Sequence, residues 1–162
     1  MERPRRRQVV ARAVAAAALL AIGCAPGGDA GPPFRPVASI HDLMHDVVYP
    51  HAEVLWDSVG TIIDKDGEHE IRPANEQEWE RVMQSALTVA EAGNLLMMEG
   101  RAKDTGEWMQ HASALIDAAT LAVKAANNRD ADAVFDIGGE VYTACNNCHE
   151  SYWEKPPSAM RP

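Results

Sequence analysis

Two cysteines and a histidine lie close together near the C-terminal end of this 162-residue sequence, in the stretch CNNCHESYW. Cys145 and Cys148 are three residues apart, and His149 follows the second cysteine directly. A Cys-x-x-Cys pair serves three kinds of chemistry: a thiol redox couple, one half of a structural zinc site, and covalent attachment of haem. The rest of the sequence is needed to decide which of these three kinds of chemistry applies.

Zinc binding and thiol redox chemistry are both poorly matched by the surroundings of the pair. A structural zinc site needs two further ligands, commonly cysteines or histidines. The only other cysteine is Cys24, far away in the chain, and no closely spaced histidine pair lies near Cys148. A thioredoxin-like pair requires a strand–turn–helix setting with the reactive thiol at a helix N-terminus, whereas this pair falls late in a helical pattern.

Covalent haem attachment accounts for all three residues. On a helix, Cys145 and Cys148 project from one face about one turn apart, so each thiol can form a thioether with one vinyl group of haem. His149 shares that face and can place an imidazole nitrogen on the iron. Cys145, Cys148 and His149 are therefore predicted to hold one covalent haem c, with His149 as the proximal ligand.

The N-terminal part of the chain is typical of export. Residues 1–23 join an arginine-rich start to an alanine- and leucine-rich stretch that is too short to span a membrane, which predicts a signal peptide. The stretch ends in AIGC, which resembles a bacterial lipobox and makes Cys24 the candidate lipidation site; ordinary cleavage nearby, leaving a free thiol, is the alternative. Residues 24–36 are rich in glycine and proline and predict a flexible tether. Export agrees with haem c, which is joined to proteins outside the cytoplasm.

The exported chain is strongly acidic. The sequence has 15 Lys and Arg against 24 Asp and Glu, and residues 1–23 contain five of the basic and one of the acidic residues, which leaves 10 against 23 and a formal net charge of −13. Nucleic acid and anionic lipid surfaces are not expected as partners. A redox partner protein with a basic patch is expected. The alternative is that the acidic surface of this chain serves only to keep it soluble.

Four segments with helical periodicity have to position the haem motif. Apolar residues recur at three- and four-residue spacing over about 40–55, 75–97, 107–127 and 130–152. Residues 61–72 alternate around Asp66-Gly67 and predict a small hairpin between the first two helices. The sequence thus predicts an all-α fold, an antiparallel four-helix bundle over residues 37–155 with the haem on its last helix, followed by a tail at 156–162.

Several residues mark where the predicted helices begin, bend or end. Ser39, Asn75 and Asp130 are suitable N-caps, because their side-chain oxygens can accept hydrogen bonds from the first helical turn. Pro50 is expected to kink the first helix, since proline has no backbone N–H to donate. Gly100 is expected to end the second helix.

A four-helix bundle with Cys-x-x-Cys-His on its last helix resembles the cytochrome c-prime family, the class II c-type cytochromes, including its low-spin members with a methionine ligand. The similarity covers about residues 37–155 and includes Tyr152, which matches a tyrosine often found three residues after the haem histidine. Trp153 stands where many members of that family carry arginine or lysine. The resemblance also implies dimerisation through the first two helices, giving a homodimer.

In that family the haem packs between the first and last helices, and a side chain of the first helix faces the distal side of the iron. The first helix begins SIHDLMH, so the resemblance makes Met44 the candidate distal ligand. Core packing is the alternative role for Met44, and His41 or His45 is the alternative ligand. Methionine ligation implies a six-coordinate iron suited to electron transfer, whereas an open position implies binding of NO or CO.

These features predict an exported, lipid-anchored monohaem c-type cytochrome that carries single electrons and is not an enzyme. The alternative is a five-coordinate haem protein that binds NO or CO, and peroxidase activity is a distant third. The predicted location is periplasmic, on either the outer or the cytoplasmic membrane. Three tryptophans are expected to pack in the bundle, although one of them could shield a haem edge: Trp56, Trp79 and Trp108. Three histidines are expected to bind no metal: His51, His69 and His111.

Overall fold

The computed structural model describes residues 34–153. The predicted signal peptide at 1–23, the candidate lipidation site Cys24, most of the predicted tether and the tail at 156–162 lie outside the described residues. Within the described part, no helix is both long enough and apolar enough to cross a membrane.

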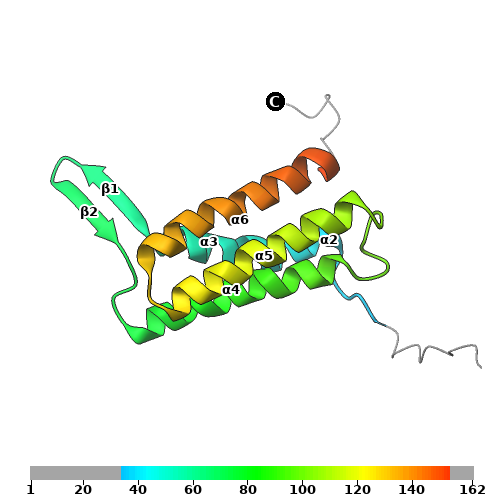
Figure 1. The fold of residues 1–162 in the computed structure, drawn as a ribbon, viewed down its shortest axis with the longest axis horizontal. Coiled ribbons are helices and arrows are strands. Elements are labelled where there is room, and N and C mark those ends of the chain that lie inside the picture. The colour runs from blue at the N-terminus through cyan, green and yellow to red at the C-terminus, as the bar shows by residue number, and fades with distance from the viewer. Residues whose placement is uncertain (1–33, 154–162) are drawn as a thin grey trace, which may run out of the picture. The chain divides into compact units, whose positions relative to one another are not determined.

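Four helical segments form an antiparallel bundle (Figure 1). The first segment is continuous through α2 (Ile40–Asp42), the π-helical η1 (Leu43–Val48) and α3 (Tyr49–Asp57). It is followed by α4 (Glu76–Leu96), α5 (Glu107–Asn127) and α6 (Ala131–Tyr152). Helix α5 packs against both α4 and α6, and the first segment packs mainly against α4. The predicted helical bundle is confirmed.

A two-stranded antiparallel hairpin connects the first segment to α4. Strand β1 (Gly60–Asp64) pairs with β2 (Gly67–Ile71), and Asp64 pairs with Gly67, so the turn consists of Lys65 and Asp66. The turn therefore lies one residue earlier than the predicted Asp66-Gly67. Gly67 has a φ of 130°, a conformation that favours glycine. The hairpin projects from the end of the bundle opposite to the C-terminal end of α6 (Figure 1).

The three predicted N-caps are confirmed by hydrogen bonds. The Ser39 hydroxyl accepts from the Asp42 N–H at 3.1 Å, and the Asp42 carboxylate accepts in return from the Ser39 N–H, which completes a capping box. The Asn75 side chain accepts from the Glu78 N–H at 3.0 Å. Asp130 accepts from the Ala133 N–H at 3.0 Å. Each cap satisfies a donor that the helix itself leaves unpaired.

The end of α4 differs from the prediction. The helix ends at Leu96, and Gly100, with a φ of 86°, lies in the loop that follows instead of capping the helix. The guanidinium of Arg101, which is only 7% exposed, donates to the Leu95 carbonyl at 3.2 Å and to the Ala38 carbonyl at 3.1 and 3.2 Å. The carbonyls at a helix C-terminus carry partial negative charge, so a buried cation is stabilised there.

The first segment passes Pro50 without a break. Directly before it, η1 adopts the wider π-helical register, in which the Tyr49 N–H donates to the Met44 carbonyl five residues earlier. Pro50 has no N–H and leaves one carbonyl of the preceding turn without its usual α-helical donor. The structure thus shows a change of helical register before Pro50 where the sequence predicted a kink. Such π segments occur frequently at functional sites.

The buried apolar side chains form two clusters. The cavity-side core joins the first segment to α4, α5 and the second half of α6, and includes Leu43, Val48, Leu96, Trp108, Leu115 and Val141. The hairpin-side core lies towards the hairpin and includes Leu55, Val59, Trp79, Val82, Ala122 and Val134. The Cys-x-x-Cys-His motif belongs to the cavity-side end, because Cys145 packs against that cluster.

Candidate functional site

A cavity of about 550 Å³ lies between the first helical segment and α6. These two elements touch each other little, since each packs mainly on a central helix, α4 or α5. Leu96, Trp108, Ala112 and Leu115 from α4 and α5 form the floor. Most lining groups are apolar, and the volume falls within the roughly 300–1,000 Å³ of small-molecule and cofactor sites. The cavity is therefore large enough to bury a cofactor.

The wall formed by α6 carries all three residues of the Cys-x-x-Cys-His motif. Cys145, Cys148 and His149 line the cavity together, as expected for residues spaced by three and four on one helix. Both cysteines are free thiols and partly buried. Burial raises the pKa of each thiol, with the neighbouring Cys148 adding to the effect at Cys145 and Glu107 at Cys148. A reactive redox cysteine has a lowered pKa, so the environment does not favour thioredoxin-like chemistry.

His149 is held against an aromatic ring. Trp153 packs edge-on against the imidazole, with ring centroids 4.7 Å apart and an interplanar angle of 77°. Burial lowers the pKa of His149, which favours the neutral imidazole. A neutral imidazole has one nitrogen lone pair available for a metal.

The opposite wall comes from the first helical segment and includes Met44. Met44 lies in the π-helical stretch, is partly buried against the cavity-side core and lines the cavity. His41 and His45 lie at the rim, because their side chains are 84% and 73% exposed. The thioether of Met44 is thus better buried than either alternative imidazole.

Helix α5 contributes a histidine that the sequence did not single out. His111 lines the cavity, and its Nε2 is buried without a hydrogen-bond partner among the described residues. The nearest carboxylate oxygen, Glu107 Oε1, is 3.4 Å away, but the geometry is not that of a hydrogen bond. His111 follows Trp108 by three residues and precedes Leu115 by four, so helical periodicity already placed it on the apolar face of α5.

The C-terminal end of α6 is fastened to the loop before α5. The Tyr152 hydroxyl donates to the Asp104 carboxylate, and the Tyr152 ring packs edge-on against Trp108 with centroids 5.0 Å apart. The Trp108 indole N–H in turn donates to the Leu96 carbonyl at 2.9 Å. These contacts hold the floor of the cavity against the helix that carries the cysteines.

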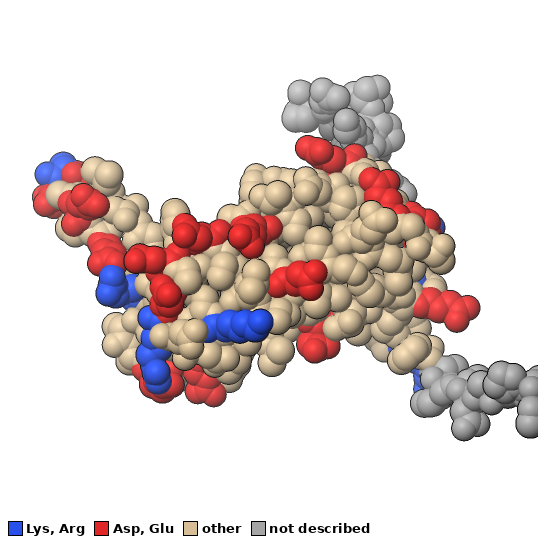
Figure 2. All heavy atoms as spheres, in the orientation of Figure 1, with Lys and Arg blue, Asp and Glu red and all other residues tan. Residues whose placement is uncertain are grey.

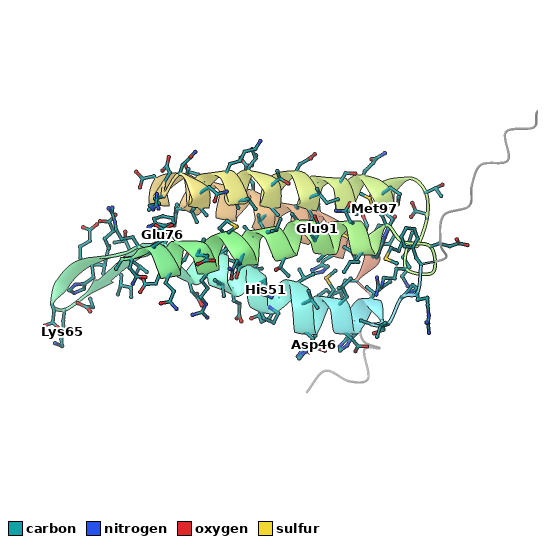
Figure 3. The ribbon with its side chains drawn as sticks, turned by 90° about the horizontal axis from the view of Figure 1, so that it is seen from below. Asp46, His51, Lys65, Glu76, Glu91 and Met97 are labelled. Carbon is teal, nitrogen blue, oxygen red and sulfur yellow. The ribbon has the colours of Figure 1, made fainter. Side chains whose placement is uncertain are left out.

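The other tryptophans and histidines considered in the sequence lie in different parts of the fold. Trp56 lines the cavity and donates from Nε1 to the Gly138 carbonyl at 3.0 Å, which joins the first segment to α6. Trp79 lies in the hairpin-side core. His51 faces α4, where its Nδ1 lies 3.2 Å from the Ser85 hydroxyl (Figure 3). His69 is on the hairpin, 3.3 Å from Asp64.

The surface around α6 is acidic. The helix carries Asp132, Asp136, Glu140 and Glu150 and no lysine or arginine. Figure 2 shows acidic side chains along this helix, while the basic side chains in view gather near the end from which the hairpin projects. This helix therefore carries negative charge that no lysine or arginine of its own balances.

The comparisons with known proteins gave no relative. No family model, curated protein or solved structure matched the chain. Within residues 34–153, no group of three or more His, Cys, Asp and Glu side chains is arranged to hold a metal ion.

The donor set around the cavity fits a flat, largely apolar cofactor that carries its own metal. Two thiols and a neutral imidazole face the space from α6, and a thioether faces it from the first segment. His111 also lines the cavity, and its buried Nε2 lacks a hydrogen-bond partner among the described residues. Haem c is a flat, largely apolar cofactor that carries its own metal.

Proposed function

We propose that the chain is an exported monohaem c-type cytochrome that carries single electrons. The observation that supports this most directly is that Cys145, Cys148 and His149 line one wall of an apolar cavity, and Met44 lines it from the opposite helical segment. Haem c, when bound there, supplies reversible one-electron exchange at its iron.

Each residue of the site has a distinct task in this proposal. Cys145 and Cys148 would hold the haem through thioether bonds, and their free thiols are available for that purpose. His149 would serve as the proximal ligand, with Trp153 fixing the orientation of its ring. Met44 would serve as the distal ligand. Axial ligands of these two kinds raise the reduction potential relative to two histidines.

The surrounding apolar residues would keep water away from a haem iron bound in the cavity. Leu96, Trp108 and Leu115 are buried and form the floor of the cavity. An apolar shell limits solvent access and thereby influences the reduction potential. Residues that exclude water and provide two strong axial ligands suit electron transfer better than ligand activation.

The acidic surface suggests how such a protein would meet its partner. The four carboxylates of α6 lie on the helix that also carries the cysteines. A redox partner with a basic patch would be steered towards this helix, so that association would slow as salt is added. Lipidation of Cys24, outside the described residues, would hold the protein at the membrane on the periplasmic side.

The optical spectrum of the haem-loaded protein tests the proposal. Wild type is expected to show a low-spin haem with the weak far-red absorption of a methionine–iron bond in the oxidised state, and Met44→Ala is expected to lose that absorption. Met97→Ala is the matched control, because Met97 is also partly buried against the cavity-side core but does not line the cavity.

Other outcomes would separate the remaining alternatives. A high-spin spectrum that Met44→Ala leaves unchanged, and that shifts with carbon monoxide, would reject Met44 as ligand and favour gas binding. Loss of the low-spin spectrum in His45→Ala or His41→Ala would assign the distal position to an imidazole. A chain that is exported by a host with haem c assembly and carries no covalent haem would reject the proposal altogether.

A further inference from the structure

Two exposed histidines stand side by side at the rim of the cavity. His41 and His45 are four residues apart on the first helical segment, and their rings are stacked with centroids 6.0 Å apart and an interplanar angle of 7°. Their side chains are 84% and 73% exposed, so both rings are open to ions in solution.

Each ring has a carboxylate on its Nδ1 side. His45 Nδ1 lies 2.7 Å from Asp46 Oδ1, and His41 Nδ1 lies 3.4 Å from Asp42 Oδ1. Asp46 lies on the outer side of the first segment, as Figure 3 shows.

These carboxylates determine which nitrogen of each ring is free. A carboxylate at Nδ1 accepts the ring proton, which leaves the lone pair on Nε2. Metal-binding histidines commonly show this arrangement, in which a second group holds one ring nitrogen and the other binds the ion. Here the arrangement occurs twice, on neighbouring rings.

We propose that His41 and His45 form a chelating site for a divalent transition-metal cation through their two Nε2 atoms, with water completing the coordination. Imidazole suits Zn²⁺, Ni²⁺ and Cu²⁺, and Cu²⁺ binds tightest in the usual order of stability. Two protein ligands are fewer than the four of a structural zinc site, so this is an exchangeable site.

A chelate requires the two rings to turn as well as to approach, because the lone pair of an imidazole nitrogen lies in the ring plane and the two planes are nearly parallel. Two imidazoles that share one ion through bonds of about 2.0–2.1 Å have ring centroids roughly 5 Å apart, so the separation has to shorten by about 1 Å. The exposed side chains can rotate to make this change. Asp42 and Asp46 add negative charge next to the rings, which favours a cation.

The two rings lie at the rim of the cavity that would hold the haem, and the proposal gives them no part in binding its iron. Met44 is better buried than either ring and is the candidate ligand on this wall. The inference therefore does not depend on haem binding, and it can fail while the proposed function stands.

Titration of the untagged, haem-loaded protein with Cu²⁺ tests the proposal. Calorimetry is expected to give one tight Cu²⁺ per chain, and electron paramagnetic resonance is expected to show coupling of the copper to imidazole nitrogens. Asp46→Asn is expected to weaken binding by about tenfold, and His41→Ala or His45→Ala by more than that. These residues are exposed, so the variants are expected to fold.

His69→Ala is the matched control. His69 is another exposed histidine beside a carboxylate, with its Nε2 3.3 Å from Asp64 Oδ1, but it stands alone on the hairpin. Its removal is expected to leave Cu²⁺ binding unchanged. Wild-type affinity in His41→Ala and His45→Ala would overturn the proposal. It would also be overturned if either variant changed the axial-ligand spectrum of the haem, since the imidazole would then belong to the iron.

Discussion

The bundle contains one pair of helices in close contact, α4 and α5, called the closed pair. The first helical segment and α6 are held apart by the cavity and are called the open pair. Between α4 and α5, the backbones approach so closely at Gly93 that a Cβ there would lie 2.5 Å from Ile116 Cγ1 and 3.1 Å from the Ala112 carbonyl oxygen. Between the first segment and α6, the cavity takes the place of such packing, and the Trp56–Gly138 hydrogen bond joins the two elements at one end.

Within one fold, the closed pair provides close packing and the open pair provides the candidate site. The closed pair consists largely of small side chains in close contact, whereas the open pair carries the two cysteines, His149 and Met44. An enclosed and dry apolar cavity of about 550 Å³ would cost about 13 kcal/mol at roughly 24 cal/mol per Å³, which is comparable with the total stability of a domain; this cavity is partly open to solvent, so its cost is smaller. A cofactor that fills this cavity, as proposed, would therefore stabilise the open pair.

The largest effect is expected from removal of both thiols. The double variant Cys145→Ala, Cys148→Ala should lose covalent haem entirely and should unfold at a markedly lower temperature, because the cavity loses a permanently attached occupant. Haem staining after denaturing electrophoresis and thermal unfolding measure the two effects. Asn147→Ala, an exposed neighbour on α6, should change neither. Haem that stays covalently attached in the double variant would contradict the assignment of the two cysteines of the open pair as its attachment site.

A pair of glycine substitutions compares the closed pair with the outer face of α6. Gly93→Ala should lower the free energy of unfolding by about 1–3 kcal/mol, because the added methyl group overlaps Ile116 and the Ala112 backbone. Gly139→Ala meets no atom within 4 Å and should instead raise it by about 0.5–1 kcal/mol, since alanine favours the helix. Denaturant unfolding of both variants measures the difference, and equal shifts would contradict the close approach of α4 and α5.

The smallest effect is expected at the contact that fastens α6 to the α4–α5 loop. The hydrogen bond to Asp104 raises the pKa of Tyr152 from 10.0 to about 12, and the same bond lowers the pKa of Asp104 below 3.8. Both groups are at the surface, so Tyr152→Phe should lower the melting temperature less than Gly93→Ala does.

The pH dependence of this contact follows from the directions of the two shifts. The folded protein holds the Tyr152 proton more tightly, so the contribution is complete below pH 10.0 and is lost as the pH rises through about 12. The folded protein holds the Asp104 proton less tightly, so the contribution is complete above pH 3.8 and is lost as the pH falls through the lowered pKa. The difference in melting temperature between wild type and Tyr152→Phe should vanish at both extremes, while Tyr142→Phe, at a tyrosine of α6 that is 56% exposed, should track wild type throughout.

Local features of the chain were predictable without the tertiary structure. The caps at Ser39, Asn75 and Asp130 were identified correctly because a capping side chain bonds to its own first turn. The hairpin was also identified, although its turn lies one residue earlier, since strand pairing rather than the Asp-Gly dipeptide set the register. Gly100 was assigned wrongly because α4 already ends at Leu96, where the Leu95 carbonyl accepts from Arg101 and the Leu96 carbonyl from Trp108.

The sequence by itself determined that Cys145, Cys148 and His149 share one helix face, because spacing along a helix depends on backbone geometry alone. Only the tertiary structure decided that Met44 lines the same cavity, that His41 and His45 lie exposed at its rim, and that His111 lines it while its Nε2 is buried. These relations join residues on different helices. They depend on how far apart the helices pack and on the π-helical turn, which are properties of side chains in contact across the whole bundle.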